Sequence, residues 1–219
     1  MAEVNFVTPL HIGTKRDYGA RATADKGACA AVARQWGVDY WDGARAYGFG
    51  GMRYDGRWLP VAEAMARHYG LRAGDRVLDI GCGKGFLLYE LTRAVPGLEV
   101  AGLDISTYAV EHAKPEVHSQ LTVGTASTLP WPDAQFDLVL SINTLHNLYN
   151  YELDAALAEI MRVGRRHRYI CVESYRNEVE KANLLYWQLT CEAFCTPREW
   201  HWLFDRHGYR GDWEFIFFD

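Results

Sequence analysis

The stretch Val77-Leu78-Asp79-Ile80-Gly81-Cys82-Gly83-Lys84-Gly85-Phe86 decides the fold of this chain of 219 residues. The apolar run at 76–80 predicts a buried strand, and it leads directly into a loop with three alternating glycines. Apolar residues then recur at helical spacing over 86–94. Glycines let a ligand approach the main chain closely, and the free N–H groups at a helix start attract anions. We therefore expect a strand–loop–helix unit that binds a ligand.

The chain beyond this unit continues to alternate short apolar runs with helical patterns. Further strands are predicted at 99–103, 121–123, 136–142, 168–172 and 213–218, and further helices at 108–114, 154–163, 178–194 and from Thr196, with Pro197 and Glu199 completing a helix start. Apolar strands that alternate with helices favour a parallel sheet covered on both faces, and right-handed crossovers make it doubly wound. We expect an α/β fold with a mostly parallel sheet over residues 61–219.

The first 60 residues differ from the rest because they are rich in glycine and aromatic residues. Glycines at 48, 50 and 51 interrupt regular structure there. We expect residues 1–60 to form an extension that docks on the main body. Its rings either cover a ligand site as a lid or only anchor the extension. Tyr47, Tyr54 and Trp58 flank the glycines and are the better lid candidates.

The composition indicates a globular chain with an ordinary core. The net charge is -5 and the isoelectric point is about 5.9, which favours a small-molecule substrate over nucleic acid. The five cysteines are odd in number and include no CxxC pair, so we expect neither a disulfide framework nor a metal site. Cys191 and Cys195 are one helical turn apart, and a half-buried helix face is favoured over metal ligation.

The first residues show no basic region followed by an apolar run, so we expect no signal peptide. No apolar stretch approaches the ~20 residues that span a bilayer. We therefore expect a cytoplasmic protein without a membrane partner.

The spacing of the glycines discriminates between ligand classes. In the dinucleotide fingerprint G-x-G-x-x-G the third glycine would fall at Phe86, whereas here it is Gly85. A phosphate-binding P-loop would need Ser or Thr after Lys84. Asp79 lies two residues before the first glycine, where it can accept a hydrogen bond from the α-amino group of S-adenosylmethionine (SAM). A nicotinamide dinucleotide has no α-amino group to donate this hydrogen bond, so the spacing favours SAM.

Two later segments extend this hypothesis. Asp104 closes the second predicted strand, where an acid accepts hydrogen bonds from ribose hydroxyls, although nicotinamide enzymes use the same device. The segment 124–130 follows the third strand, and it either borders an adenine ring or is an ordinary surface loop.

The motifs VLDIGCGKG, LDIS and GTASTLPWPDAQFDLVLSINTLHNL, in this order, resemble the successive motifs of class I SAM-dependent methyltransferases. The resemblance covers roughly residues 71–173 and implies a Rossmann-like methyltransferase fold with SAM as cofactor. It implies a SAM site at Asp79, Gly81, Cys82, Gly83, Asp104, Ile105, Ala126, Ser127 and Asn143. The family usually ends in two strands with an antiparallel edge, but only one strand is predicted here. We expect a shortened C-terminal sheet edge.

The methyl acceptor should bind beside the carboxyl ends of the strands. His146, after the fourth strand, is a candidate general base, and its alternative role is to hold the turn through a loop carbonyl. Glu173, after the fifth strand, is a second candidate base, with an ion pair to Arg176 as the alternative. Candidate acceptor-binding residues are Tyr54, Asn147, Tyr175 and Arg176.

The residues after the fourth strand read Asn143-Thr144-Leu145-His146 and lack the prolines typical of enzymes that methylate DNA bases. We expect a methyltransferase that acts on oxygen or nitrogen of a small polar metabolite, such as a sugar or a natural-product intermediate. The alternatives are a nicotinamide-dependent oxidoreductase and a non-catalytic SAM-binding subunit. Phe86 and the lack of a Tyr-x-x-x-Lys pair argue against the oxidoreductase.

Overall fold

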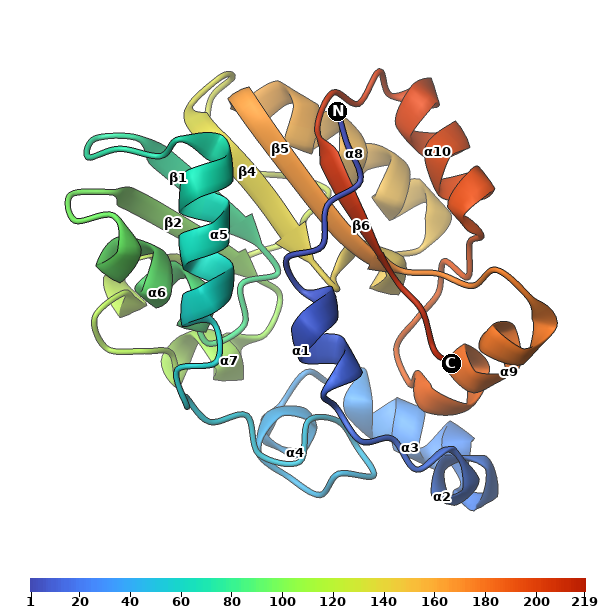
Figure 1. The fold of residues 1–219 in the computed structure, drawn as a ribbon. Helices are drawn as coiled ribbons and strands as arrows, with labels where there is room; N and C mark the ends of the chain where they lie inside the picture. Colours follow the sequence, from blue (N-terminus) through green and yellow to red (C-terminus); the bar gives the residue numbers. More distant parts are fainter.

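One six-stranded sheet organises the computed structural model, which describes all residues from Met1 to Asp219 (Figure 1). The strands are β1 (Arg76–Ile80), β2 (Glu99–Asp104), β3 (Leu121–Val123), β4 (Phe136–Ile142), β5 (Gly164–Glu173) and β6 (Asp212–Ile216). Their order in the sheet is β3-β2-β1-β4-β5-β6, and every neighbouring pair is parallel. The predicted doubly wound α/β fold is confirmed, with a sheet that is parallel throughout.

Two apolar clusters cover the two faces of the sheet. Helices α5 (Leu59–Tyr69) and α6 (Phe86–Ala94) pack on one face, and α8 (Asn150–Val163) and α10 (Pro197–Arg206) pack on the other. Successive strand residues alternate between the faces, so that Leu78 belongs to one cluster and Val77 to the other. Burial of one such side chain stabilises the fold by about 1.5–3 kcal/mol.

The remaining elements connect these layers. They are α7 (Thr107–Glu111), η1 (His118–Gln120), η2 (Leu145–Asn147) and α9 (Glu178–Trp187). The helix predicted over 178–194 ends at Trp187, because the N–H groups of Glu192 and Ala193 donate to the His146 carbonyl instead of continuing a helix. Cys191 and Cys195 therefore do not share a helix face, and that expectation is wrong.

The edge of the sheet at β6 is completed by the start of the chain. Val4 N–H donates to the Trp213 carbonyl at 2.9 Å, and Trp213 N–H donates to the Ala2 carbonyl at 3.1 Å. The buried carboxylate of Glu214 accepts from the amides of Phe6 and Val7 at 2.7 and 3.0 Å, just before α1 (Thr8–Ile12) begins. The single C-terminal strand is thus covered by the N-terminal segment rather than by an antiparallel partner.

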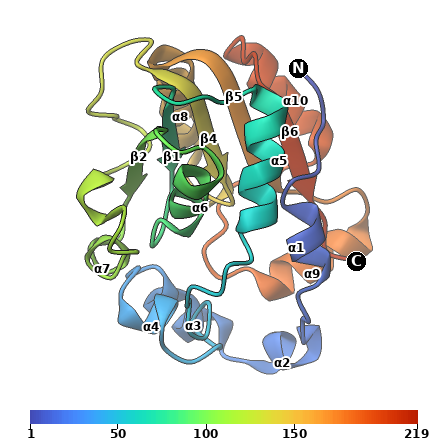
Figure 2. The same cartoon turned by 60° about the vertical axis from the view of Figure 1, so that its left-hand side comes forward.

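The rest of the extension forms three more short helices, α2 (Tyr18–Thr23), α3 (Lys26–Ala33) and α4 (Val38–Trp41). Figures 1 and 2 show them beyond the end of the sheet at which the strands terminate. Residues 42–58 contain no helix or strand, as their glycines predict. None of the helices in the structure is both long and apolar enough to span a bilayer.

Candidate active site

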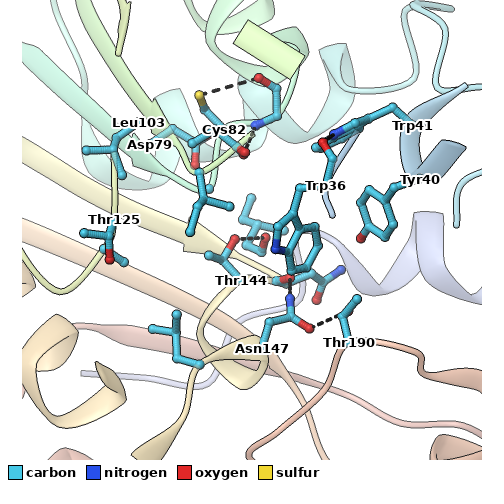
Figure 3. Close-up of a pocket in the computed structure, with 18 of the residues that line it drawn as sticks. Trp36, Tyr40, Trp41, Asp79, Cys82, Leu103, Thr125, Thr144, Asn147 and Thr190 are labelled. Carbon is cyan, nitrogen blue, oxygen red and sulfur yellow. Dashed lines mark hydrogen bonds between the residues drawn. The ribbon is translucent and has the colours of Figure 1, made fainter. Parts of the chain in front are cut away.

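A cavity of about 430 Å³ opens at the carboxyl ends of β1 and β4 (Figure 3). The strand order reverses between these neighbours: from β1 the chain continues to β2 in one half of the sheet, and from β4 it continues to β5 in the other half. In doubly wound sheets, ligands bind at this switch point. The floor of the cavity is the glycine loop after β1, and the extension closes it from the opposite side.

The glycines of this loop are required by geometry. Gly81, Gly83 and Gly85 have φ values of 82°, 54° and 71°, which side chains rarely adopt. A Cβ on Gly81 would overlap the Thr144 side chain, and one on Gly83 would lie 3.0 Å from the ring of Trp41. Thr144 and Trp41 therefore pack directly against the glycine main chain, where a side chain would not fit.

Two carboxylates, Asp79 and Asp104, line the cavity at the ends of β1 and β2. Asp79 is 4 % exposed, and its Oδ1 has no hydrogen-bond partner. Burial, with the nearby charge of Asp104, raises the pKa of Asp79 to about 8. Asp104 accepts from the amides of Gly83 and Ser106 at 2.7 and 2.8 Å, while burial raises its pKa. An unpartnered buried acid next to a second acid calls for a cationic ligand.

The other predicted SAM-site residues lie on the same cavity, with one exception. Cys82, Ile105, Ala126 and Asn143 line it. Ser127 is not part of the lining, and its hydroxyl pairs with Thr125 Oγ1 at 2.8 Å. Thr125 takes its place on the wall.

The extension supplies aromatic residues that the sequence did not single out: Trp36, Tyr40, Trp41 and Phe49. The indole N–H of Trp41 donates to Ser106 Oγ at 2.8 Å, and its ring stacks on Phe49. The sequence shows the three glycines of the loop after β1 and the aromatic residues of the extension. It does not show that α4 packs against that loop.

Of the three lid candidates, only Trp58 lines the cavity. Tyr47 packs beside the small cluster around Cys29. Tyr54 lies against α6, where its hydroxyl donates to Glu90 Oε1 at 2.5 Å and its ring contacts Phe86. The structure therefore does not place Tyr54 at the acceptor site.

His146 and Glu173, predicted on separate segments, meet in the structure. Glu173 N–H donates to His146 Nδ1 at 3.2 Å, so neutral His146 carries its proton on Nε2. That Nε2 lies 3.3 Å from Glu173 Oε2. Burial lowers the pKa of His146 to about 3 and raises that of Glu173 to about 8. The pair lines a second cavity of about 380 Å³ that adjoins the first.

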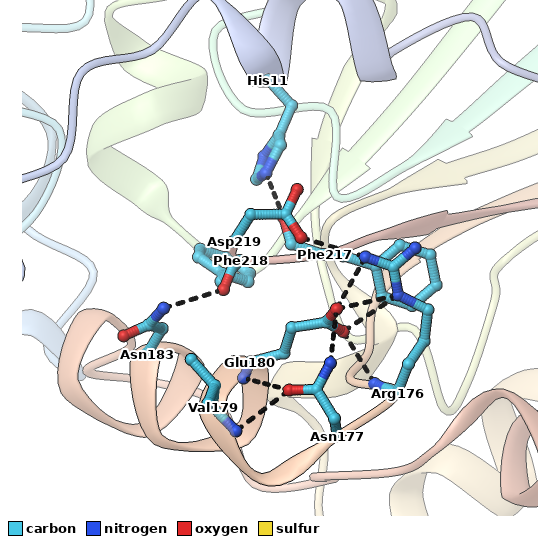
Figure 4. A network of polar contacts seen from close by, with 9 residues as sticks. All are labelled: His11, Arg176, Asn177, Val179, Glu180, Asn183, Phe217, Phe218 and Asp219. Carbon is cyan, nitrogen blue, oxygen red and sulfur yellow. Dashed lines mark hydrogen bonds and ion pairs between the residues drawn. The ribbon is translucent and has the colours of Figure 1, made fainter.

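Of the remaining residues predicted to bind the acceptor, only one lies at the cavities. Asn147 lines both cavities and accepts from the Thr190 hydroxyl at 2.8 Å (Figure 3). Arg176 lines neither, because its guanidinium pairs with Glu180 and Asp219 (Figure 4). Tyr175 also lies outside both cavities, and the Lys181 ammonium lies 5.2 Å from its ring centre.

Comparison with known proteins agrees with this geometry. Residues 78–172 match the model of a methyltransferase domain family. Over 114 residues the chain is 34 % identical to a 27-O-demethylrifamycin SV methyltransferase of Amycolatopsis mediterranei, covering 48 % of this chain and 42 % of that protein. Over 128 residues it is 31 % identical to a demethylmenaquinone methyltransferase of Symbiobacterium thermophilum, covering 54 % and 50 %. The chain thus spans about half the length of the curated relatives it matches.

Among solved structures, the YcgJ protein from Bacillus subtilis shares the fold. It superposes with a TM-score of 0.53 at 24 % sequence identity, covering 67 % of this chain and 66 % of that one.

Proposed function

We propose that this chain is a class I SAM-dependent methyltransferase that transfers the methyl group of SAM to an oxygen or nitrogen of a small polar metabolite. The observation that carries the proposal is Asp79, which lines the first cavity and whose buried Oδ1 has no hydrogen-bond partner. A cationic α-amino group would satisfy that oxygen and restore the ordinary ionisation of the acid.

The residues around the cavity fit the rest of SAM. Asp104 keeps free lone pairs on both oxygens after accepting from Gly83 and Ser106, so it can also accept from ribose hydroxyls. Ala126 and Ile105 offer apolar surface for adenine at the ends of β3 and β2. SAM supplies an activated methyl group on a sulfonium sulfur.

The chain's own contribution is to position the acceptor and take its proton. In-line positioning supplies much of the rate of such a transfer. Glu173 is the better general base, because its Oε2 has no hydrogen-bond partner and burial raises its pKa toward neutrality. His146 is a positioning residue, since one ring nitrogen accepts from Glu173 N–H and the other faces Glu173 Oε2. Asn147, at the junction of the cavities, is placed to bind the acceptor.

The small size of the acceptor is supported by the size of the site. Trp36 and Trp41 of the extension line the first cavity, which measures about 430 Å³ and must hold SAM as well. The curated relatives named above act on 27-O-demethylrifamycin SV and demethylmenaquinone, which are small molecules. We assign residues 1–60 the role of a cover that excludes water from the site.

Calorimetric titration of the full chain with SAM, S-adenosylhomocysteine and NADH tests the proposal. Both sulfur compounds should bind with one site per chain, and NADH should not. Asp104→Asn should weaken binding about tenfold, because it removes the charge and one of the two oxygens that accept from the amides of Gly83 and Ser106. Arg176→Gln, a surface change, should leave it unaltered. Binding of NADH without SAM would instead support the oxidoreductase.

A further inference from the structure

Three arginines converge on one aromatic ring at the second cavity. The guanidinium carbons of Arg16, Arg21 and Arg45 lie 5.5, 5.0 and 5.1 Å from the ring centre of Trp187. They come from three separate parts of the extension, whereas Trp187 ends α9. All four residues line the cavity of about 380 Å³.

None of these three arginines forms an ion pair with a carboxylate, although Glu173 lines the same cavity. Arg21 donates to the Ala46 carbonyl at 2.7 Å, Arg45 to the Phe49 carbonyl at 2.7 Å, and Arg16 to the His11 carbonyl at 3.1 Å. Arg176, by contrast, pairs with the Glu180 carboxylate. Burial lowers the pKa of Arg21, and the charge of Arg45 lowers it further. Three guanidinium groups that share a cavity with one unpaired acid, Glu173, leave an excess of positive charge, which indicates a site for an anion.

Two residues that line this cavity also have a buried polar atom without a hydrogen-bond partner. These atoms are Nε of Arg16, a donor, and Oε2 of Glu173. Glu173 is 6 % exposed. The Arg57 side chain, which also lines the cavity, is already paired with Asp55. The free N–H group of Arg16 can donate a hydrogen bond to a ligand. An anion, which the positive charges also favour, would accept that hydrogen bond.

The second cavity adjoins the methyl-transfer site. Asn143, Asn147 and Thr190 line both cavities. Glu173, the proposed base, lines the second cavity together with the arginines. An acceptor that reaches from one cavity to the other would place one end among the arginines and its nucleophile at the junction, where Asn143 and Asn147 lie.

We propose that the methyl acceptor is an oxyanion, a carboxylate or phosphate ester, whose anionic group binds to Arg16, Arg21 and Arg45. This inference rests on the proposed function. Guanidinium groups bind both kinds of oxyanion through paired hydrogen bonds. The ring of Trp187 holds the three groups in place and adds a flat apolar surface for the body of the acceptor. In the transfer, the acceptor O–H or N–H bond breaks, its proton goes to the Glu173 carboxylate, and the new bond joins the acceptor atom to the methyl carbon as the carbon–sulfur bond breaks.

The test is a titration of the full chain, saturated with S-adenosylhomocysteine, with inorganic phosphate and separately with benzoate. Binding is followed by the arginine Nε–H resonances in nitrogen-15 spectra, assigned through the variants. Both anions should shift the resonances of the cluster in a saturable way. Tighter binding of phosphate assigns a phosphorylated acceptor, and tighter binding of benzoate assigns a carboxylate.

The variants Arg16→Gln and Arg45→Gln should each weaken anion binding about tenfold, the value of one charge-assisted hydrogen bond. Arg45→Lys should retain most of it, since the charge remains, and this variant guards against a fold defect. Arg176→Gln, an equal change of charge outside the cavity, should have no effect. Equal anion binding by wild type and Arg16→Gln, or an equal loss in Arg176→Gln, would overturn the inference.

The same samples separate this inference from the proposed function. S-adenosylhomocysteine affinity should be unchanged in Arg16→Gln and Arg45→Gln. If the wild type binds S-adenosylhomocysteine but no anion, the inference fails and the methyltransferase proposal stands. If it binds anions but not S-adenosylhomocysteine, the proposed function fails.

Discussion

Lys84 in the glycine loop donates to both carboxylate oxygens of Asp42 in the extension, at 2.8 and 2.7 Å. The lysine side chain is only 7 % exposed, and it also donates to the Met52 carbonyl at 3.1 Å. The pair therefore fixes the extension directly to the loop that forms the floor of the first cavity. It also explains why a lysine follows Gly83 in a loop that is not a P-loop.

Breaking this pair should loosen the cover of the site. We expect Asp42→Asn to lower the free energy of unfolding by about 2 kcal/mol, below the cost for a fully buried pair because Asp42 is partly exposed. It should also weaken SAM binding and speed proteolysis between residues 36 and 58. Chemical denaturation, calorimetry and limited proteolysis measure the three effects. Glu116→Gln, which breaks the exposed pair with Lys114, is the matched control and should change none of them.

Asp79→Asn should weaken SAM binding and stabilise the cofactor-free protein. Burial raises the pKa of Asp79 to about 8, so the folded state holds a proton that the unfolded state has lost. The stability of the wild type therefore falls as pH rises from about 4 to 8, by up to about 1.4 kcal/mol per unit. The stability of the asparagine variant does not depend on this titration. The difference between its melting temperature and that of the wild type should therefore grow as the pH rises over that range. A difference independent of pH would contradict the assignment.

Glu173 as general base predicts a rising limb in the pH profile of kcat/KM. Burial raises its pKa to about 8, opposed by Gln188 and Arg16, and the base acts as the carboxylate. The logarithm of kcat/KM should rise with a slope of about 1 below pH 8 and level off above it. Glu173→Gln should abolish the limb together with most of the turnover. Retention of the limb in that variant would assign it to another group.

His146 as a positioning residue predicts a different signature. Its Nε2 lies 3.3 Å from Glu173 Oε2 without forming a hydrogen bond, and the partial positive charge of that N–H group favours the ionised base. In His146→Ala the limb should move to higher pH while SAM affinity stays close to that of the wild type. A lower kcat without any movement of the limb would indicate a purely structural role.

The regular part of the fold was predictable from the sequence because its signals are local. β1 and α6 occur at the predicted residues, since an apolar run, a glycine turn and a helical period follow one another without interruption. The start of α10 at Thr196, with Glu199 reaching back, was also predicted. The acids at the ends of β1 and β2 followed from the parallel sheet, because parallel strands bring their carboxyl ends to one edge.

The parts that were missed depend on contacts between distant segments. Trp41 reaches the cavity because its indole bonds Ser106, 65 residues away. Arg16 and Arg45, both in the N-terminal extension, converge on Trp187 in the C-terminal part of the chain, and no spacing in the sequence reveals this. Arg176 was assigned to the acceptor because it follows β5, but Glu180, one helical turn later, holds it outside the cavity.

A crystal structure of the full chain with S-adenosylhomocysteine would show whether Asp79 and Asp104 hold the cofactor. We expect the compound in the cavity lined by the glycine loop and Trp41, with its α-amino group in hydrogen-bond contact with Asp79 Oδ1 and its ribose hydroxyls on Asp104. Its sulfur should face Asn147. A complex in which Asp79 Oδ1 remains without a partner, or in which the compound lies outside this cavity, would contradict this expectation.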